Sequence, residues 1–420
     1  MRAIRGPSFL LLFLLLLAPR MGAQEPVPSP SDEVRRLEAE LLALRQDFAA
    51  RLAALEAKLA ALEAPTPPPA ETAPPAGPPE APAPPAAAVA PTVNIPSLGS
   101  KVFNPDIAVI GNFLGAAGKN DSSTAPPSLE MAESEASFQA IVDPYARADF
   151  FLTFGPEEVG VEEGFITFPT VPGGLLLKVG KLRDAFGKVN GMHAHVLPWT
   201  DRPLVIGDLV GGEDGLADAG LSLSRLIPNR FLFLEATAQA YQGNSAIFAA
   251  PKRSDLAYVG HLRAYRDLGE SSNLDFGGSF AHGHNGVTAD TTTRLWGADL
   301  TFRWRPLRRA IYRRFLARTE LVWSRREGEE APSSAFGMYA SADYQFARRW
   351  FLGGRYDRAE RAEDASLHDE GGSLLLSWWP SEFSQIRGQF RHTDYAEGTA
   401  ANEFLFQFLF AIGAHGAHVF

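Results

Sequence analysis

Residues 294–305 read RLWGADLTFRWR, and apolar and polar side chains alternate along this stretch. In an extended chain successive side chains point to opposite faces, so the two kinds separate. The apolar face carries Trp296, Ala298, Leu300, Phe302 and Trp304. The polar face carries Asp299, Thr301 and Arg303. The pattern predicts a β-strand with one hydrophobic face and one polar face.

The same alternation recurs throughout residues 93–420. Runs of about 9 to 13 residues, the length of a strand that crosses a bilayer at a tilt, are separated by Gly, Pro, Asp and Asn. The runs begin near residues 105, 129, 145, 161, 175, 216, 231, 256, 273, 293, 312, 335, 350, 372, 384 and 402. In a soluble sandwich all these hydrophobic faces would share one core, whereas a closed barrel turns them toward lipid and leaves no free strand edge. We therefore predict an all-β protein, a transmembrane antiparallel up-and-down β-barrel of about 16 strands, with about 14 or 18 as alternatives.

The last run strengthens this prediction. It places Phe404, Phe406, Phe408, Phe410, Ile412, Ala414 and Phe420 in one register. This ending resembles that of bacterial outer-membrane barrels, which characteristically finish on a strand with a terminal Phe. Aromatic residues also recur at the ends of the other apolar faces, as expected where a barrel wall meets the lipid headgroups.

Residues 1–23 have the features of a secretory signal peptide. Arg2 and Arg5 precede the apolar run 9–18, and the small residues Gly22 and Ala23 follow it. The run is shorter than the about 20 residues that a helix needs to span a bilayer, so we expect cleavage after Ala23 rather than a membrane anchor. We expect the mature chain in the cell outer membrane of a Gram-negative bacterium, with its N-terminal segment in the periplasm.

Composition and motifs exclude several classes of function. The chain has no cysteine, which excludes disulfides, thiolate metal sites and cysteine nucleophiles. Its net charge of −10 argues against a nucleic-acid partner. The sequence has no GxSxG elbow, HExxH zinc signature, phosphate-binding loop or dinucleotide fingerprint. We therefore expect no enzyme, no catalytic residue and no cofactor.

Residues 24–64 are predicted to form a periplasmic coiled-coil segment. Within 31–64 the apolar residues are three or four apart, with one stutter: Val34, Leu37, Leu41, Leu44, Phe48, Leu52, Leu55, Leu59 and Leu62. This seam favours self-association into a homotrimer through residues 31–64 and the barrel walls, and a single amphipathic helix packed on the barrel is the alternative. Residues 65–92 contain 12 prolines and predict a stiff linker. The linker would allow the N-terminal segment to reach a cell-wall or periplasmic component.

Residues 162–204 carry a family resemblance. They read EEGFITFPTVPGGLLLKVGKLRDAFGKVNGMHAHVLPWTDRPL, with a Glu-Gly-Phe strand, Gly180-Lys181 at a strand end and Asp201-Arg202-Pro203 downstream. This stretch resembles the phosphate-selective porin O/P-like outer-membrane family. The resemblance implies a trimeric, water-filled channel for small hydrophilic solutes or ions, with anions such as phosphate as candidates. It also implies a constriction loop around residues 187–215, which would contain His193, His195, Asp201 and Arg202.

The polar faces of the predicted strands supply candidate pore-lining residues. These are Arg147, Asp149, Arg263, Asp299, Arg303, Arg318, Glu320, Arg355, Asp357, Arg387 and Arg391. Because both signs of charge are present, ion selectivity stays open. In one interpretation the charges form cross-strand ion pairs. In the other, an arginine track between Arg303 and Arg391 faces acidic early strands across the lumen.

Two histidine pairs suggest a rival function. His193 with His195, and His282 with His284, could each chelate a metal from an extended chain. Neither pair has an evident third ligand nearby in the sequence, so we predict no bound metal. An outer-membrane receptor or transporter for metal ions or chelates, of the TonB-linked type, remains the alternative function, although no segment long enough to form the plug of such a receptor precedes the predicted barrel.

Overall fold

The computed structural model describes residues 105–122, 126–132, 134–155, 159–212 and 215–413. The predicted signal peptide, coiled coil and linker, and the terminal Phe420, lie outside these ranges. Within them, no helix is long and apolar enough to cross a membrane.

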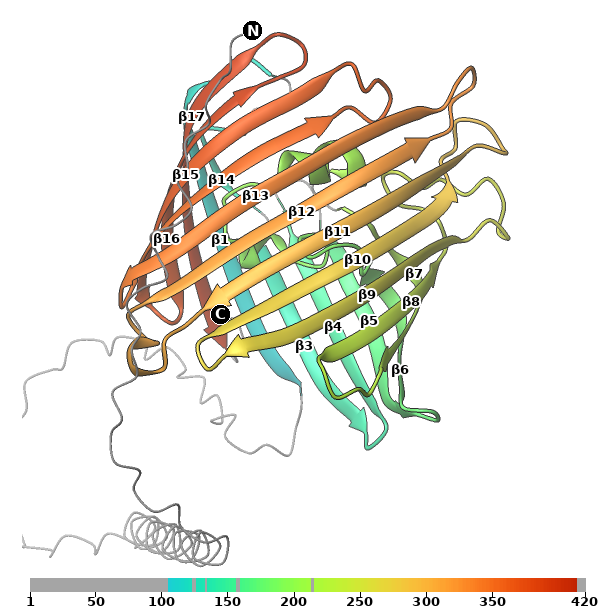
Figure 1. The fold of residues 1–420 in the computed structure, drawn as a ribbon, viewed down its shortest axis with the longest axis horizontal. Coiled ribbons are helices and arrows are strands. Elements are labelled where there is room, and N and C mark those ends of the chain that lie inside the picture. The colour runs from blue at the N-terminus through green and yellow to red at the C-terminus, as the bar shows by residue number, and fades with distance from the viewer. Residues whose placement is uncertain (1–104, 123–125, 133, 156–158, 213–214, 414–420) are drawn as a thin grey trace, which may run out of the picture. The chain divides into compact units, whose positions relative to one another are not determined.

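The described chain is built of antiparallel strands that follow one another around a single sheet (Figure 1). The strands are β1 (Asp106–Lys119), β2 (Leu129–Met131), β3 (Ser134–Asp143), β4 (Ala146–Phe154), β5 (Val159–Val171), β6 (Leu175–Arg183), β7 (Ala217–Leu226), β8 (Phe233–Tyr241), β9 (Ala257–Gly269), β10 (Ser272–His284), β11 (Thr292–Trp304), β12 (Arg314–Arg326), β13 (Ser333–Ala347), β14 (Trp350–Glu360), β15 (His368–Ser381), β16 (Ser384–Asp394) and β17 (Ala400–Gly413). A short 3-10 helix, η3 (Leu307–Arg309), lies in the turn before β12.

The sheet closes on itself because β1 pairs with β17. β2 and β3 both pair with β1, at Phe113–Gly115 and Asp106–Ile110 respectively, and so make one interrupted barrel strand. The 17 strands of the sheet thus form a closed barrel of 16 strands, which confirms the predicted fold and strand number. The predicted runs each coincide with one barrel strand.

The two faces of the wall differ as the alternation predicts. In β11, Trp296 and Leu300 are each 40% exposed on the outside, whereas Asp299 and Thr301 are buried on the inside. The outer face of β17 carries the exposed Phe404 and Ile412, and its inner face carries the buried Glu403 and Gln407. An apolar outer surface around a polar interior is the reverse of a soluble barrel and is typical of a wall that faces lipid.

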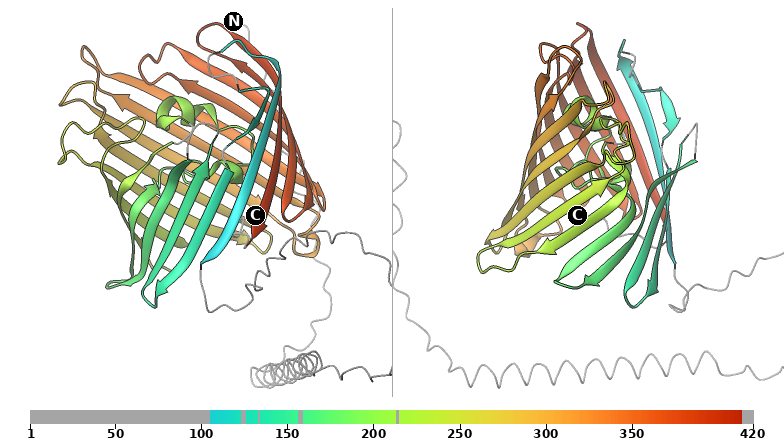
Figure 2. Two further views of the ribbon diagram at one scale, coloured as in Figure 1. Left: turned by 180° about the vertical axis from the view of Figure 1, so that it is seen from behind. Right: turned by 90° about the vertical axis from the view of Figure 1, so that its right-hand side faces the viewer.

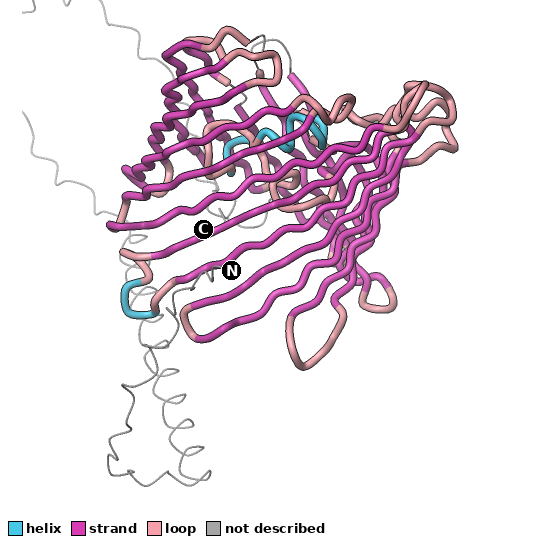
Figure 3. Tube along the Cα trace, turned by 45° about the horizontal axis from the view of Figure 1, so that its top comes forward, coloured by secondary structure: helices cyan, strands magenta, loops and turns pink. Residues whose placement is uncertain are grey.

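The connection between β6 and β7, residues 184–216, folds into the barrel instead of projecting from its rim (Figures 1 and 2). We call it the inner loop. It contains a 3-10 turn, η1 (Ala194–Val196), and a π-helical turn, η2 (Ile206–Gly211). Figure 3 shows both turns surrounded by the strands of the wall.

Hydrophobic burial explains why the inner loop is inside. Its buried apolar residues are Phe186, Val189, Leu197, Trp199, Val205, Ile206, Leu209, Val210 and Leu216. They pack on an apolar patch of the inner wall: Tyr241, Val259, Ala281, Leu295, Val322, Tyr339, Ala359 and Leu375. Full burial of each large apolar side chain contributes about 1.5–3 kcal/mol. The hydrophobic core of the barrel therefore lies between the inner loop and one side of the wall.

Candidate functional site

The inner loop is the candidate constriction, and its two ends are joined at its base. Asp184 N donates a hydrogen bond to Leu216 O at 2.9 Å. The fully buried Asn190 side chain donates to both Asp184 O and Leu216 O at 2.9 Å, and its Oδ1 accepts from Leu216 N at 2.7 Å. Gly215 has φ 62°, and a Cβ there would meet Asn190 Oδ1 at 2.2 Å. The side-chain amide of Asn190 thus joins the two ends of the inner loop.

The first part of the inner loop binds to the wall through its backbone. Ala185 N donates to Gln239 Oε1 at 2.7 Å, and Gly187 N donates to Ser279 Oγ at 2.9 Å. Val189 N donates to Glu320 Oε1 at 2.8 Å. Side chains from β8, β10 and β12 therefore supply the acceptors that buried backbone N–H groups need.

Asp201 attaches the loop to strands β14 and β16 of the wall. Its Oδ2 accepts from Arg355 Nη2 and Arg391 Nη1, both at 2.9 Å, and its Oδ1 accepts from Gln389 Nε2 at 2.7 Å. We call Asp201, Arg355, Gln389 and Arg391 the carboxylate clasp. Burial raises the pKa of Asp201, but the two arginines lower it by more, so the pKa lies well below its usual range. Asp201 is therefore ionised at neutral pH.

The clasp is supported by an edge-to-face aromatic pair, Trp199 and Tyr339. The ring of Trp199 lies 4.9 Å from the Arg355 guanidinium and 5.2 Å from the Tyr339 ring. Thr200 donates through N and Oγ1 to Gln389 Oε1 at 3.0 and 2.8 Å. A cation over an indole face is favourable, and more so when it is shielded from water.

His193 attaches the loop to β3 and β5. His193 Nδ1 lies 2.5 Å from Glu135 Oε2 and 3.2 Å from Glu162 Oε2, and its Nε2 lies 2.7 Å from Glu163 Oε2. Glu162 also pairs with Arg183. We call Glu135, Glu162, Glu163, Arg183, His193 and His195 the anchor cluster. It ties the loop to β3, β5 and β6, whereas the clasp ties it to β14 and β16, so the inner loop is fastened to separate parts of the wall.

A β-bulge places two consecutive glutamates in this cluster. In the pairing of β4 with β5, Phe151 pairs with Glu163 and Leu152 with Val161, so Glu162 is the extra residue. A bulge re-aims a side chain that strict alternation would send to the other face. Burial lowers the pKa of His193, but hydrogen bonds to Glu135 and Glu163 and the charges of Glu162 and Glu135 outweigh it and raise the pKa to about 10.

The far end of the loop carries a second carboxylate. Asp208, in η2, lies 3.4 Å from Arg361, which also pairs with Asp369 at 2.7 Å and Glu397 at 3.2 Å. Burial, followed by the charge of Asp369, raises the pKa of Asp208 to about 7 despite Arg361. Arg202, a predicted constriction residue, instead braces the loop internally, because it donates to Val189 O and Met192 O at 3.1 and 2.8 Å.

The predicted pore-lining residues all lie on the side of their strands opposite the exposed apolar side chains, and most carry an ion pair or a hydrogen bond. The ion pairs are Arg147–Asp149 at 2.7 Å, Arg263–Asp275 at 2.8 Å, Arg303–Asp275 at 3.4 Å, Arg318–Asp343 at 3.6 Å, Arg355–Asp357 at 2.6 Å and Arg391–Glu403 at 2.5 Å. Lys188 of the inner loop adds pairs to Asp275 at 2.8 Å and Asp299 at 3.5 Å. Glu320 accepts from the loop backbone and from Tyr339 Oη at 3.0 Å.

Positive charge exceeds negative charge on one part of the inner wall. Arg314 and Arg318 of β12 flank Leu316, which pairs with Asp343 of β13. Arg387 of β16 also interacts electrostatically with Asp343, but its hydrogen bonds go to neutral groups, Gln407 Oε1 at 2.6 Å and Ser377 Oγ and Gln385 Oε1 at 3.2 Å. We call Arg314, Arg318 and Arg387 the basic patch. Asp343 is the carboxylate that all three share, and Glu320 and Asp201 also attract Arg318 and Arg387 respectively.

Sequence reasoning missed several residues that hold the inner loop. It did not predict a role for Asn190, Gln389, Tyr339 or the pair Glu162 and Glu163. Their function depends on contacts between segments that are distant in the chain, for example Thr200 with Gln389. Local alternation carries no information about such contacts.

Comparisons with known proteins identify the fold. No family model matches the chain. The chain is 28% identical over 386 residues to an uncharacterized protein of Aquifex aeolicus, and the match covers 76% of this chain and 81% of that protein. Its fold is similar to Pseudomonas putida OprB, with a TM-score of 0.52, 9% identity and coverage of 73% of this chain and 93% of that chain.

Two further solved structures have a similar fold. The anion-selective porin from Comamonas acidovorans has a TM-score of 0.50 and 11% identity, with coverage of 73% of this chain and 98% of that chain. The outer membrane channel DcaP of Acinetobacter baumannii has a TM-score of 0.50 and 9% identity, with coverage of 73% of this chain and 97% of that chain. At these identities the likeness establishes the fold. The described part of the chain has the barrel fold of outer-membrane porins.

Proposed function

We propose that the protein is an outer-membrane porin that lets small hydrophilic solutes diffuse through its barrel, with the inner loop as the constriction. The observation that carries this proposal is a closed barrel with an apolar outside, a charged inside and one loop fastened across its interior at both the anchor cluster and the carboxylate clasp. Charged side chains in a water-filled lumen lower the cost of moving hydrated solutes across the membrane.

We further propose that the channel prefers anions. The basic patch carries three guanidinium groups around Asp343, and pore walls rich in arginine favour anions. Part of the negative charge of the anchor cluster is compensated by close partners, since Glu162 pairs with Arg183 and Glu135 with His193. The resemblance of residues 162–204 to phosphate-selective porins supports the same class of solute, although phosphate itself is only one candidate.

We also propose a homotrimer, held through residues 31–64 and the apolar barrel walls. The supporting observation for the walls is their continuous outer surface of exposed apolar side chains, such as Leu352, Leu374 and Phe390. Part of that surface can pack against a second copy while the rest faces lipid.

The experiment that tests the channel is planar-bilayer recording of the purified protein. We expect ohmic conductance in steps of three, and a reversal potential in a salt gradient that reports anion preference. A folded, heat-modifiable barrel that shows no conductance would contradict the porin function and favour the metal or chelate receptor. A cation-selective reversal potential would contradict only the proposed anion preference.

A further inference from the structure

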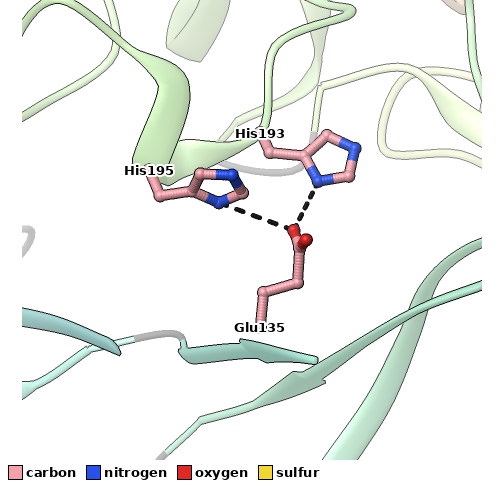
Figure 4. A group of neighbouring side chains, drawn as sticks. All are labelled: Glu135, His193 and His195. Atoms are coloured by element: carbon pink, nitrogen blue, oxygen red, sulfur yellow. Dashed lines mark hydrogen bonds and ion pairs between the residues drawn. The ribbon is translucent and has the colours of Figure 1, made fainter. Parts of the chain in front are cut away.

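The anchor cluster brings histidine and carboxylate ligands together from two separate segments (Figure 4). Glu135 comes from β3, and His193 and His195 come from the inner loop. One ligand atom from each of the three lies within 4.8 Å of the others. The side chains are 5%, 11% and 11% exposed, so the group is shielded from bulk water.

The distances suit a tetrahedral metal site. Two ligand atoms about 2.1 Å from a zinc ion at a tetrahedral angle lie about 3.4 Å apart. His195 Nδ1 lies 3.5 Å from Glu135 Oε2, and Glu162 Oε2 lies 3.2 Å from His193 Nδ1. The contact between His193 Nδ1 and Glu135 Oε2, at 2.5 Å, is a hydrogen bond that must open by about 0.9 Å to admit an ion. Rotation of the Glu135 side chain can supply that movement.

The surroundings of His193 also match a metal ligand. Its second nitrogen, Nε2, lies 2.7 Å from Glu163 Oε2, and Glu163 Oε1 accepts from Arg183 N at 2.7 Å. A carboxylate that receives the distal N–H of a ligating histidine fixes the tautomer and makes the other nitrogen a better ligand. Glu163 is therefore placed to leave Nδ1 of His193 available to a metal.

Charge balance within the cluster favours a divalent ion. The cluster holds three carboxylates, Glu135, Glu162 and Glu163, and one guanidinium, that of Arg183, which pairs with Glu162. A proton on His193 leaves one carboxylate charge uncompensated among these residues, whereas a divalent cation balances all three. Buried charges are costly unless they are paired, so the cation has an electrostatic advantage over the proton.

One of the ligands also borders a small crevice. His195 lines a crevice of about 20 Å³ with Ile110, Gln385 and Leu409. A crevice of this volume can hold a water molecule, which needs roughly 10–15 Å³.

We propose that Glu135, His193 and His195 bind a divalent transition-metal ion of the Zn²⁺ class, with Glu162 as a fourth ligand, and that the ion ties the inner loop to β3. The bound ion would hold the inner loop in its position across the lumen. Metal binding goes beyond the porin function and can succeed or fail independently of conductance.

The test is Zn²⁺ titration by calorimetry of the full chain, produced without a histidine tag and stripped with EDTA. We expect one Zn²⁺ per chain. His195→Ala and Glu135→Gln each remove one ligand and should weaken binding by at least about a hundredfold. Glu163→Gln replaces the orienting carboxylate by a neutral amide with one acceptor oxygen and should weaken binding about tenfold. Co²⁺ in place of Zn²⁺ should give the visible absorption of a tetrahedral nitrogen and oxygen site, and His195→Ala should abolish it.

His284→Ala is the matched control, because His282 and His284 form the chain's other pair of histidines two residues apart. It should bind Zn²⁺ as the unaltered protein does. Heat-modifiable migration on detergent gels checks that each variant is folded, and Glu163→Gln keeps the test decisive if His195→Ala does not fold. The proposal is overturned if the unaltered protein takes up no Zn²⁺, if Glu163→Gln binds with unchanged affinity, or if His284→Ala is the substitution that abolishes binding.

Discussion

Replacing Asp201 by asparagine should release one side of the inner loop. In the carboxylate clasp, Asp201 Oδ2 accepts from Arg355 and Arg391 at 2.9 Å each. The amide of an asparagine can offer only one oxygen. Whichever way the amide is turned, its NH₂ group faces either two guanidinium donors or the donor Nε2 of Gln389.

The magnitude follows from the bonds that are lost. A hydrogen bond to a charged group contributes about 1.5–3 kcal/mol, so two such bonds amount to about 3–6 kcal/mol. The lower end applies here, because Arg355 keeps Asp357 at 2.6 Å and Arg391 keeps Glu403 at 2.5 Å. A loss of about 3 kcal/mol shifts the equilibrium between docked and undocked loop on the order of 100-fold.

Limited trypsin digestion measures this shift. Cleavage after Lys188 requires the loop to leave the wall, and the rate of cleavage tracks the undocked population when opening is fast relative to cleavage. The matched control is Asp208→Asn, the same chemical change in the same loop, at a carboxyl whose pKa of about 7 leaves it partly protonated at neutral pH. Equal cleavage of Asp201→Asn and the unaltered protein, or equal acceleration by Asp208→Asn, would refute the role of the clasp.

Three further predictions concern pH, selectivity and assembly. Burial and Asp369 raise the pKa of Asp208 above its value of 3.8 in an undocked loop, so the docked loop binds the extra proton and docking should weaken as pH rises from about 4 to about 7. Relative to the rate at which trypsin cleaves an unfolded substrate at the same pH, cleavage of the loop should be slower at pH 5 than at pH 8, and Asp208→Asn should reduce this difference. Arg387→Gln removes a unit charge from the inner wall. The interaction of that charge with an ion 4 Å away in water is worth about 1 kcal/mol, so the anion-to-cation permeability ratio from reversal potentials should fall about fivefold. Arg358→Gln, on the outer face of β14, is the control and should leave the ratio unchanged. Deletion of residues 31–64 should loosen the oligomer in size-exclusion chromatography with light scattering while the barrel stays heat-modifiable, and an oligomer of unchanged stability would contradict the proposed role of that segment.

The sequence predicted the barrel well because its main signal is local. Alternation between neighbouring residues reports which side of a strand faces lipid, and it located the barrel strands from β1 to β17. It could not show the interruption between β2 and β3 or the bulge at Glu162, since each changes the alternation within a few residues. It also gave no reason to expect apolar side chains such as Leu295 and Val322 on the inner face, where the inner loop packs.

The candidate site was only partly predictable. The resemblance of residues 162–204 pointed to the loop and to His193, His195 and Asp201, all of which the structure places at contacts between the loop and the wall. The sequence predicted no metal because it offered no third ligand near His193, yet Glu135 lies beside it from 58 residues earlier. Such a partner is set by barrel register and loop docking together, and neither can be read from spacing along the chain.

The pairing of β1 with β17 has a consequence for biogenesis. Its hydrogen bonds join residues as far apart as Asn112 and Gln407, which are separated by 295 positions. Until β17 pairs with β1, the two edge strands of the open sheet have unpaired amide and carbonyl groups that hydrocarbon cannot solvate. A chain that lacks residues 400–413 should therefore stall as a partly formed sheet that depends on an insertion factor. The unpaired edge strands of that sheet are a feature by which quality control in the envelope can recognise it.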